Sequence, residues 1–336
     1  MAKWRAGLAL LAGAVLAVAG AACGGDESRL TVYSGRSETL VGPLLDRFED
    51  DTGIDIQVRY GETAELAATI LEEGDNSPAD VYFAQDAGAL GALSDEGRLV
   101  VLPQELLDRV PAAYRSRDGL WVGVSGRARV VAYNTGNVDP ADLPDSILDF
   151  AGEEWEGRIG WAPTNGSFQA FATGLRRLEG EDGARAWLEG IKANDPVDYP
   201  NNLTALEAVA NGEVDVAFIN HYYLFQLREE RGEDVGARNY YIGGGDAGAL
   251  VNVAGLGILD TAGQTQDADR FIDYMLSAGA QEYFSEETNE YPLIEGVAAN
   301  PELPPLSELA APDIDLGDLA DLEGTLTLLR DTGVLP

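Results

Sequence analysis

Two neighbouring tyrosines, Tyr222 and Tyr223, are the residues of this 336-residue chain whose types and spacing best suit chemistry. They follow an apolar run at 214–219 that predicts a strand, and they open a segment with helical spacing that ends at Gly232. Neighbouring side chains point to opposite faces of a strand, but they lie only about 100° apart at the first turn of a helix. Both rings can therefore lean toward one point, where two phenolate oxygens would suit a hard trivalent cation.

The alternative is that these two rings only line a cleft or pack between domains, and the six residues 218–223 alone leave both interpretations open. The positive end of the helix dipole at this position favours phenolate over phenol. His221, the single histidine of the chain, could ligate the same cation. We expect it instead to point away or to form a local hydrogen bond.

Strand and helix patterns alternate along the chain and must position these residues. The expected strands are 30–33, 54–58, 81–84, 130–133, 159–162, 214–219 and 250–259. The expected helices are 40–48, 63–73, 87–93, 168–178, 183–191, 203–210 and 267–276. This alternation predicts an α/β protein with two lobes, each a mixed, mostly parallel sheet covered by helices. Ligands of such sheets bind beyond the carboxyl ends of the strands, which places the site in the cleft between the lobes.

No internal repeat or low-complexity linker separates the two α/β units, so we expect crossing strands to join them. The expected first lobe comprises residues 29–128 and about 251–300, and the second comprises 129–250 and about 301–336.

The first residues have the layout of an export signal, with a short basic segment before an apolar run, 6–22, that is too short to span a membrane comfortably. Small residues before the lone Cys23 resemble a bacterial lipobox, although Gly20 stands where leucine is commonest. We expect 1–22 to be a signal peptide and 23–28 a lipid-anchored tether on the outer face of the cytoplasmic membrane, in the cell envelope or periplasm. A cleaved signal followed by an incidental cysteine is the alternative.

The charge is strongly acidic, with 58 acidic against 22 basic side chains and a formal net charge of −36. This excludes nucleic-acid binding through a basic patch and predicts a soluble monomer in a salty medium. The chain has no G-x-S-x-G, GxxxxGK[ST] or HExxH motif, so we expect a binding protein and not an enzyme. A hydrolase with paired carboxylates and a cleft-free structural lipoprotein are the rival classes.

Seven short motifs point to one family: VYSG at 32–35, DVYF at 80–83, SGRARVVAYNT at 125–135, WEGRIG at 155–160, PTNGSF at 163–168, NHYY at 220–223 and EYPL at 290–293. In order and spacing, from about residue 29 to 335, the chain resembles the bacterial ferric-ion-binding proteins, which are the substrate-binding components of ABC-type iron importers. The resemblance implies a type II periplasmic-binding-protein fold, hinge-like closure on Fe³⁺ and delivery to a membrane permease.

The resemblance also implies roles for particular residues. Tyr222 and Tyr223 match the family's paired iron-ligating tyrosines. Residues matching the site of a synergistic anion, carbonate or phosphate, are Thr164, Asn165, Gly166, Ser167, Asn202 and Asn220. Free N–H groups at a helix start bind such anions readily. Arg127 or Arg129 could add a guanidinium, while one of the two could instead pair between the lobes.

The chain departs from the best-known pattern at two ligands, with Ser37 in place of a histidine and Gln85 in place of a glutamate. Fe³⁺ with two phenolates keeps one positive charge, so a third phenolate or an additional anion should complete the site. Tyr60, at the end of the second strand, is the first candidate and Tyr33 the second, although strand tyrosines commonly pack in a core or at an edge.

Other solutes remain open for this fold type. Binding proteins for oxyanions such as sulfate or molybdate, for polyamines and for thiamine share it. An oxyanion site would not need paired tyrosines, and a polyamine site would need carboxylates and aromatic rings facing the cleft. The tyrosine pair, the family motifs and the anion segment together favour iron.

Overall fold

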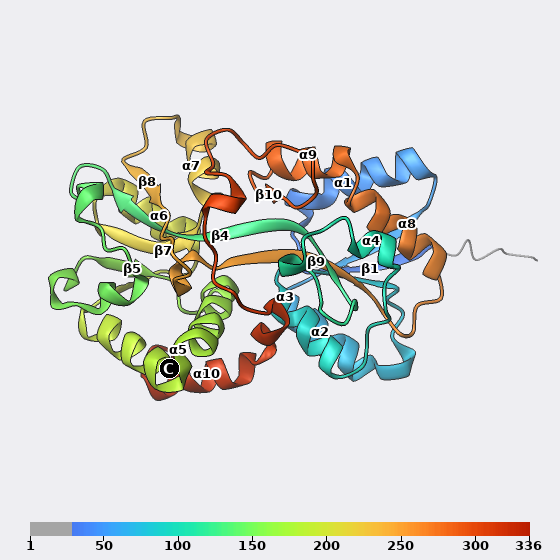
Figure 1. The fold of residues 1–336 in the computed structure, drawn as a ribbon, viewed down its shortest axis with the longest axis horizontal. Coiled ribbons are helices and arrows are strands. Elements are labelled where there is room, and N and C mark those ends of the chain that lie inside the picture. Colours follow the sequence, from blue (N-terminus) through green and yellow to red (C-terminus); the bar gives the residue numbers. More distant parts are fainter. Residues whose placement is uncertain (1–28) are drawn as a thin grey trace, which may run out of the picture.

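A computed structural model of the chain describes residues 29–336, and these residues form two lobes joined by two long strands (Figure 1). The joining strands are β4 (Val122–Asn134) and β9 (Val251–Ile258), which pair antiparallel with each other. The predicted signal peptide and tether, 1–28, lie outside the described residues.

Lobe 1 contains a sheet with helices packed against it. Its strands are β1 (Leu30–Ser34), β2 (Ile56–Tyr60), β3 (Val81–Ala84), β10 (Tyr291–Pro292), β9 and the first part of β4. Its helices are α1 (Glu38–Thr52), α2 (Thr63–Glu73), α3 (Ala87–Asp95), α4 (Gln104–Leu107), α8 (Thr265–Met275) and α9 (Ala278–Glu286). The apolar spacing predicted for α1 is confirmed, because Val41, Leu44, Leu45 and Phe48 are all buried in the core of this lobe.

Lobe 2 has a buried apolar cluster on each side of its sheet. Its strands are β5 (Ile159–Trp161), β6 (Val197–Asp198), β7 (Val216–Asn220), β8 (Ala237–Tyr240) and the second part of β4. Its helices are α5 (Gly166–Ala193), α6 (Asn202–Asn211), α7 (Tyr223–Arg231) and α10 (Leu322–Asp331). The two helices predicted at 168–178 and 183–191 are the two arms of α5, which meet at Gly180, where φ is 75°. Glycine adopts this left-handed conformation without steric cost.

The strand order is β2-β1-β3-β9-β4-β7-β5-β6, with β8 and β10 paired to β4. The mixed character predicted for the sheets is confirmed, but the prediction that they are mostly parallel is wrong. Parallel pairs occur among the outer strands, β1 with β2 and β3, and β5 with β6 and β7. Every pair that includes β4 or β9 is antiparallel, both between these two strands and with their other neighbours.

The C-terminal segment differs from the expected division of the chain. Residues 301–336 were expected in lobe 2, and α10 does pack against α5 there. However, Leu316 and Leu319 are buried in the lobe-1 core, in the segment that runs across the middle of the molecule in Figure 1. The segment that precedes α10 therefore connects the two lobes.

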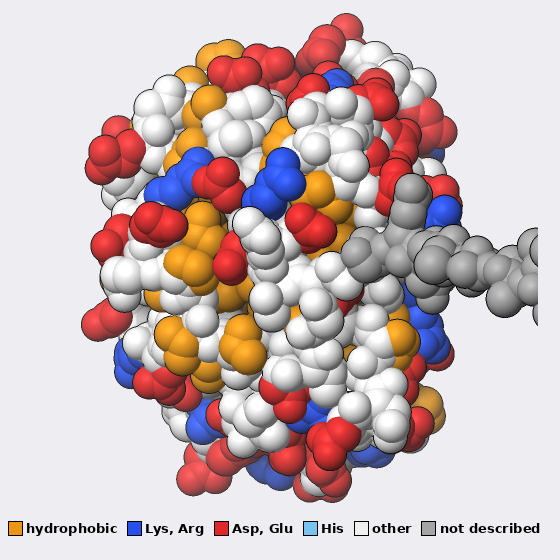
Figure 2. Space-filling model, turned by 90° about the vertical axis from the view of Figure 1, so that its right-hand side faces the viewer, with side chains coloured by type: hydrophobic (Ala, Val, Ile, Leu, Met, Phe, Trp, Pro, Cys, Tyr) orange, Lys and Arg blue, Asp and Glu red, His pale blue; other side chains and the backbone are white. Residues whose placement is uncertain are grey.

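The end of lobe 1 that lies on the right in Figure 1 shows acidic side chains scattered over its surface, with basic ones between them (Figure 2). Within residues 29–336, no helix is both long and apolar enough to cross a membrane.

Asp80 connects three segments of lobe 1, and its removal should destabilise the fold. Its carboxylate is buried and accepts backbone N–H groups of Thr31 at 2.8 Å, Gly263 at 2.8 Å and Gln264 at 3.0 Å. Asp80→Ala leaves these donors buried and unsatisfied, so we expect it to lower the free energy of unfolding by about 2–4 kcal/mol in urea titrations. The exposed Asp75→Ala is the control and should change it by less than about 0.5 kcal/mol. Equal stability of the two variants would contradict this role.

Candidate functional site

The tyrosine pair lies where β7 ends and α7 begins. Tyr222 has helical backbone angles, φ −69° and ψ −20°, and its carbonyl accepts the N–H of Gln226 at 3.3 Å. The two phenol rings consequently lie side by side, with centroids 4.3 Å apart and planes tilted by 30°. Tyr222 is 5% exposed, and Tyr223 is partly buried.

Burial raises the pKa of Tyr222, and the neighbouring Tyr223 phenol raises it further. Arg127 and Arg36 act in the opposite direction, whereas the Glu290 carboxylate also raises the pKa. The phenol of Tyr222 is therefore uncharged at neutral pH unless a cation comes close enough to stabilise the phenolate.

Arg129 places a guanidinium beside this pair. It lies opposite Asn220 in the β4–β7 ladder, and its Nη1 donates to the Asn220 Oδ1 at 3.3 Å. The guanidinium stacks over the ring of Phe171 at 5.2 Å, and its Nη2 is buried without a partner. Burial lowers the pKa of Arg129 to about 10, which the nearby Tyr223 and Tyr222 oppose, so the group stays charged at neutral pH. A buried, charged N–H without a partner is suited to an anion.

The anion segment predicted at 164–167 forms the start of α5 and meets Asn202. The Asn165 side chain caps the helix, accepting the N–H and the hydroxyl of Ser167 at 3.0 and 2.6 Å. Asn202 Nδ2 donates to Asn165 Oδ1 at 3.1 Å and to Ser167 Oγ at 2.8 Å, while the fully buried Asn202 Oδ1 has no partner. Arg129 Nη1 lies 3.5 Å from the same Ser167 hydroxyl. Thr164 and Gly166 are exposed beside this network.

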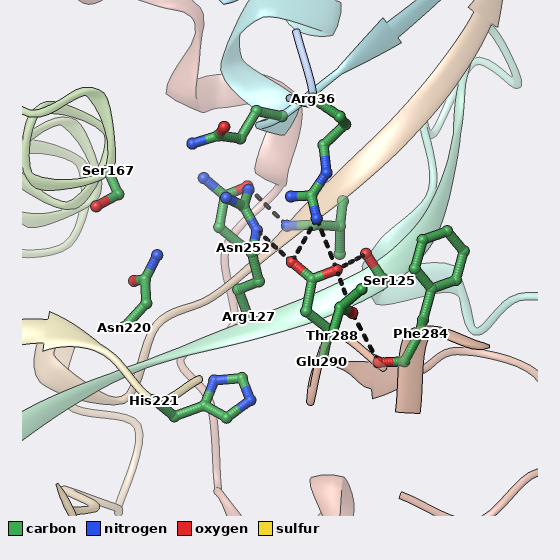
Figure 3. Close-up of polar contacts among 12 residues, drawn as sticks. Arg36, Ser125, Arg127, Ser167, Asn220, His221, Asn252, Phe284, Thr288 and Glu290 are labelled. Atoms are coloured by element: carbon green, nitrogen blue, oxygen red, sulfur yellow. Dashed lines mark hydrogen bonds and ion pairs between the residues drawn. The ribbon is translucent and has the colours of Figure 1, made fainter. Parts of the chain in front are cut away.

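Arg127 has a different partner from Arg129. Side chains two residues apart share one face of a strand, but β4 passes from lobe 1 to lobe 2 between Arg127 and Arg129. Arg127 Nε lies 3.9 Å from the carboxylate of Glu290, to which it is joined by a dashed line in Figure 3. Of the two arginines proposed for the anion, only Arg129 is next to the anion segment.

The structure does not bring the candidate third tyrosines to the pair. The Tyr33 hydroxyl donates to Glu73 at 3.0 Å and accepts from Arg59 at 3.1 Å, so it is bonded to α2 and β2. Burial raises the pKa of Tyr60, and so do the carboxylates of Glu38 and Asp46 on α1. Both rings face the helices that cover the sheet, because alternation along β1 and β2 directs them there.

Ser37 and Gln85 follow the carboxyl ends of β1 and β3. Ser37 is exposed at the start of α1, with its hydroxyl 3.2 Å from that of Thr39. Gln85 is partly buried, and its N–H donates to Thr63 Oγ1 at 3.2 Å. Neither side chain carries a charge that could balance a trivalent ion.

Sequence patterns did not reveal the charged cluster on the lobe-1 side of the junction. Glu290 is fully buried, and its carboxylate accepts Arg36 Nη2 at 2.8 and 3.0 Å and the Ser125 hydroxyl at 2.7 Å (Figure 3). Burial alone would raise the pKa of Glu290, but Arg36, Arg127 and the Ser125 hydroxyl together lower it. Arg36 and Glu290 lie in the VYSGR and EYPL stretches, but they are too far apart along the chain for local spacing to predict the pair.

His221 does not join the tyrosine pair as a ligand. Its Nδ1 accepts the N–H of Ala128 at 3.1 Å, and its Nε2 lies 2.8 Å from the carbonyl oxygen of Asn289. Burial lowers the pKa of this imidazole to about 4. Its partners are distant in sequence, so the expected local hydrogen bond is in fact a tertiary contact.

Two surface cavities among residues 29–336 lie away from the tyrosine pair. One, of about 520 Å³, is lined by α3, Arg117 and residues near Asp315. The other, of about 540 Å³, lies between Tyr114 and the segment around Ala310. Neither includes a predicted site residue, and the junction at Tyr222 is largely covered in this structure. Among residues 29–336, no group of three or more His, Cys, Asp or Glu side chains could hold a metal ion.

Two α/β lobes joined by crossing strands, with polar and aromatic side chains converging where they meet, define a solute-binding protein. The family model for bacterial extracellular solute-binding proteins matches residues 76–316, and the chain belongs to this family. It is 34% identical over 330 residues to the Fe(3+)-binding periplasmic protein of Serratia marcescens, covering 98% of this chain and 97% of that protein. It is also 34% identical to the major ferric iron-binding protein of Neisseria meningitidis serogroup B over 311 residues, 91% of this chain and 93% of that one.

Solved structures show the same fold. The crystal structure of iron-bound HitA from Pseudomonas aeruginosa matches with a TM-score of 0.85 and 38% identity, covering 91% of this chain and 99% of that chain. Trichodesmium FutA in complex with iron and citrate matches with a TM-score of 0.81 and 30% identity, again over 91% and 99%. The predicted two-lobed periplasmic-binding-protein fold is thereby confirmed.

Proposed function

We propose that this protein captures Fe³⁺ outside the cytoplasmic membrane, with the phenolates of Tyr222 and Tyr223 as ligands, and delivers it to an ABC permease. The observation that carries the proposal is the pair itself, two rings 4.3 Å apart beside a buried guanidinium with a free N–H. The relatives from Serratia and Neisseria are named for ferric iron, and membership of a substrate-binding family implies a permease partner. These relatives are named for binding, which supports a binding protein and not an enzyme.

An anion completes the proposed site. Fe³⁺ with two phenolates retains one positive charge, and the nearby Arg129 adds another, so a bound anion would lower the electrostatic free energy. We propose carbonate or phosphate, bound by Arg129, by Asn202 and Asn220 and by the helix start at 164–167. The neighbour from Trichodesmium is described with citrate, which supports a carboxylate-type anion beside the iron.

In this proposal the anion supplies the negative charge that a third phenolate, from Tyr60 or Tyr33, was expected to supply. The hydroxyl of Tyr33 is already bonded to Glu73 and Arg59, and Tyr60 lies against α1. The uncharged Ser37 and Gln85 cannot supply the missing negative charge. Iron retention should therefore depend on the anion in the buffer.

Titration of the purified protein with ferric citrate tests the proposal. Two phenolate ligands should give a visible phenolate-to-iron charge-transfer band, which a ring that only packs cannot produce. If the protein stays colourless and binds an oxyanion, a polyamine or thiamine instead of iron, the proposal of iron as the ligand is wrong, while the assignment of the fold still stands.

Iron binding should weaken as the pH falls. Burial raises the pKa of Tyr222, so the iron-free site holds a protonated phenol, and ligation as phenolate must release that proton. With two phenolates formed, affinity should fall by about 100-fold for each pH unit lowered, tenfold per proton. Competition against a chelator of known proton affinity between about pH 5 and pH 7 measures this slope. An affinity independent of pH would contradict phenolate ligation.

We also propose that Cys23 carries the lipid anchor, since the family is extracellular and its relatives are periplasmic. Cys23→Ser removes the sulfur to which the lipid would be attached. We expect the variant to appear in the soluble envelope fraction or to accumulate unprocessed, measured by immunoblot of fractionated cells. The parent protein is the control, and a variant that fractionates with membranes as the parent does would reject the anchor.

A further inference from the structure

His221 links the two lobes directly beside the tyrosine pair. The imidazole is fully buried, and because its Nδ1 accepts the Ala128 N–H, its proton lies on Nε2 and is donated to the Asn289 carbonyl. Ala128 lies on β4 where this strand leaves lobe 1, and Asn289 belongs to lobe 1. The ring also lies 4.9 Å from that of Tyr291 and 5.9 Å from that of Tyr222. A lobe-2 residue is thus bonded to the crossing strand and to lobe 1.

The loop that receives His221 has a defined backbone. Asn289 has a φ of 54°, in the left-handed region that asparagine tolerates better than most residues. Its side-chain Oδ1 accepts Asn300 Nδ2 at 2.8 Å. This conformation and this bond keep the carbonyl of Asn289 in position for the imidazole.

The next residue anchors the same loop to the wall of lobe 1. The Glu290 carboxylate accepts hydrogen bonds from the Arg36 guanidinium and the Ser125 hydroxyl, and the Arg127 Nε lies 3.9 Å from the same carboxylate (Figure 3). Arg36 directly precedes Ser37, where α1 begins, so it belongs to the end of β1 that faces the junction. A buried polar network therefore runs from the start of α7 in lobe 2 to the end of β1 in lobe 1.

We propose that His221, Asn289 and Glu290 form a hinge contact that positions the tyrosine pair against lobe 1 and so slows the release of iron. The inference rests on the proposed function, and these three residues act through the pair without touching iron. The joining strands β4 and β9 allow the lobes to bend relative to each other. A buried hydrogen bond beside the ligands restricts that bending, because opening it would leave the Asn289 carbonyl unsatisfied.

The substitution His221→Phe tests the hinge contact. It keeps a ring against Tyr291 but removes both hydrogen bonds. The position of the charge-transfer band should be unchanged, because both phenolates remain. Release of iron to a competing chelator should be at least about tenfold faster. Small-angle scattering, measured well below the unfolding temperature, should show a smaller iron-induced decrease in the radius of gyration. His221→Gln keeps a donor for Asn289 and should release iron at an intermediate rate.

A matched control is Tyr82→Phe, which keeps a buried ring and removes one buried hydrogen bond inside lobe 1, from the Tyr82 hydroxyl to the Thr63 carbonyl at 2.6 Å. It should release iron within about twofold of the parent rate. An unchanged release rate in His221→Phe overturns the hinge contact. A lost or shifted band also overturns it, because His221 would then act on the ligands themselves. If His221→Phe does not fold, the same measurements on His221→Gln test the hinge contact. A parent protein that binds no iron rejects the proposed function instead.

Discussion

Tyr222→Phe and Tyr223→Phe should each bind ferric ion more than about 100-fold more weakly than the parent, since removal of an outer-shell partner alone commonly costs 10- to 100-fold. Each change deletes one ligand oxygen and keeps the ring, so the fold should be nearly unaffected. Each single variant should shift or weaken the charge-transfer band, and the double variant should be colourless. Visible spectra and competition with a chelator measure both effects.

Tyr60→Phe is the matched control for these variants. Tyr60 lies beside Glu38 and Asp46, away from the pair, so its hydroxyl should contribute nothing to the band or to the affinity. An unaltered spectrum in both Tyr222→Phe and Tyr223→Phe would reject the ligand assignment. A loss of iron affinity in Tyr60→Phe would instead support Tyr60 as a third phenolate ligand.

The second large effect is expected from Arg129→Met, which removes the buried guanidinium and keeps an unbranched side chain over Phe171. Loss of a buried charged partner of the anion should weaken iron binding in carbonate or phosphate by about 3 kcal/mol, roughly 100-fold. In anion-free buffer the parent and the variant should bind with similar affinity. Calorimetric titration with ferric ion, with and without each anion, measures the difference.

Arg59→Met is the control for this change, because Arg59 also stacks on an aromatic ring but is half exposed in lobe 1. It should leave the anion dependence unchanged. Arg129→Met also removes the hydrogen bond from Nη1 to Asn220 Oδ1, so its free energy of unfolding is measured alongside its affinity. Equal anion dependence in the parent and in Arg129→Met would show that the anion binds elsewhere.

Local sequence patterns were sufficient to predict those features that depend on side chains close together along the chain. The apolar spacing of α1 and α2 and the strand-to-helix step at Tyr222 follow from side chains within a few residues of each other. The juxtaposition of the two phenol rings was predictable for this reason. The helix at 168–178 was also predicted from local spacing, but α5 starts two residues earlier, at Gly166, after its cap Asn165.

Strand directions were decided only by tertiary structure. The early part of β4, with Gly123 and Gly126, has no alternating pattern because nearly all of this strand is buried on both faces, and it was not predicted. Its antiparallel pairing with β9 depends on a chain return of more than 100 residues, which local periodicity does not encode.

The sequence by itself determined that two tyrosines lie side by side at a helix start, and it predicted that a second helix starts at the segment proposed for an anion. Only the tertiary structure decided which arginine reaches the anion segment, because Arg129 Nη1 lies 3.5 Å from the Ser167 hydroxyl whereas Arg127 Nε lies 3.9 Å from Glu290. It also directed Tyr33 to Glu73 and buried Glu290 against Arg36 across 254 residues. These contacts depend on how distant segments pack together, whereas sequence patterns indicate only the secondary structure that neighbouring residues favour.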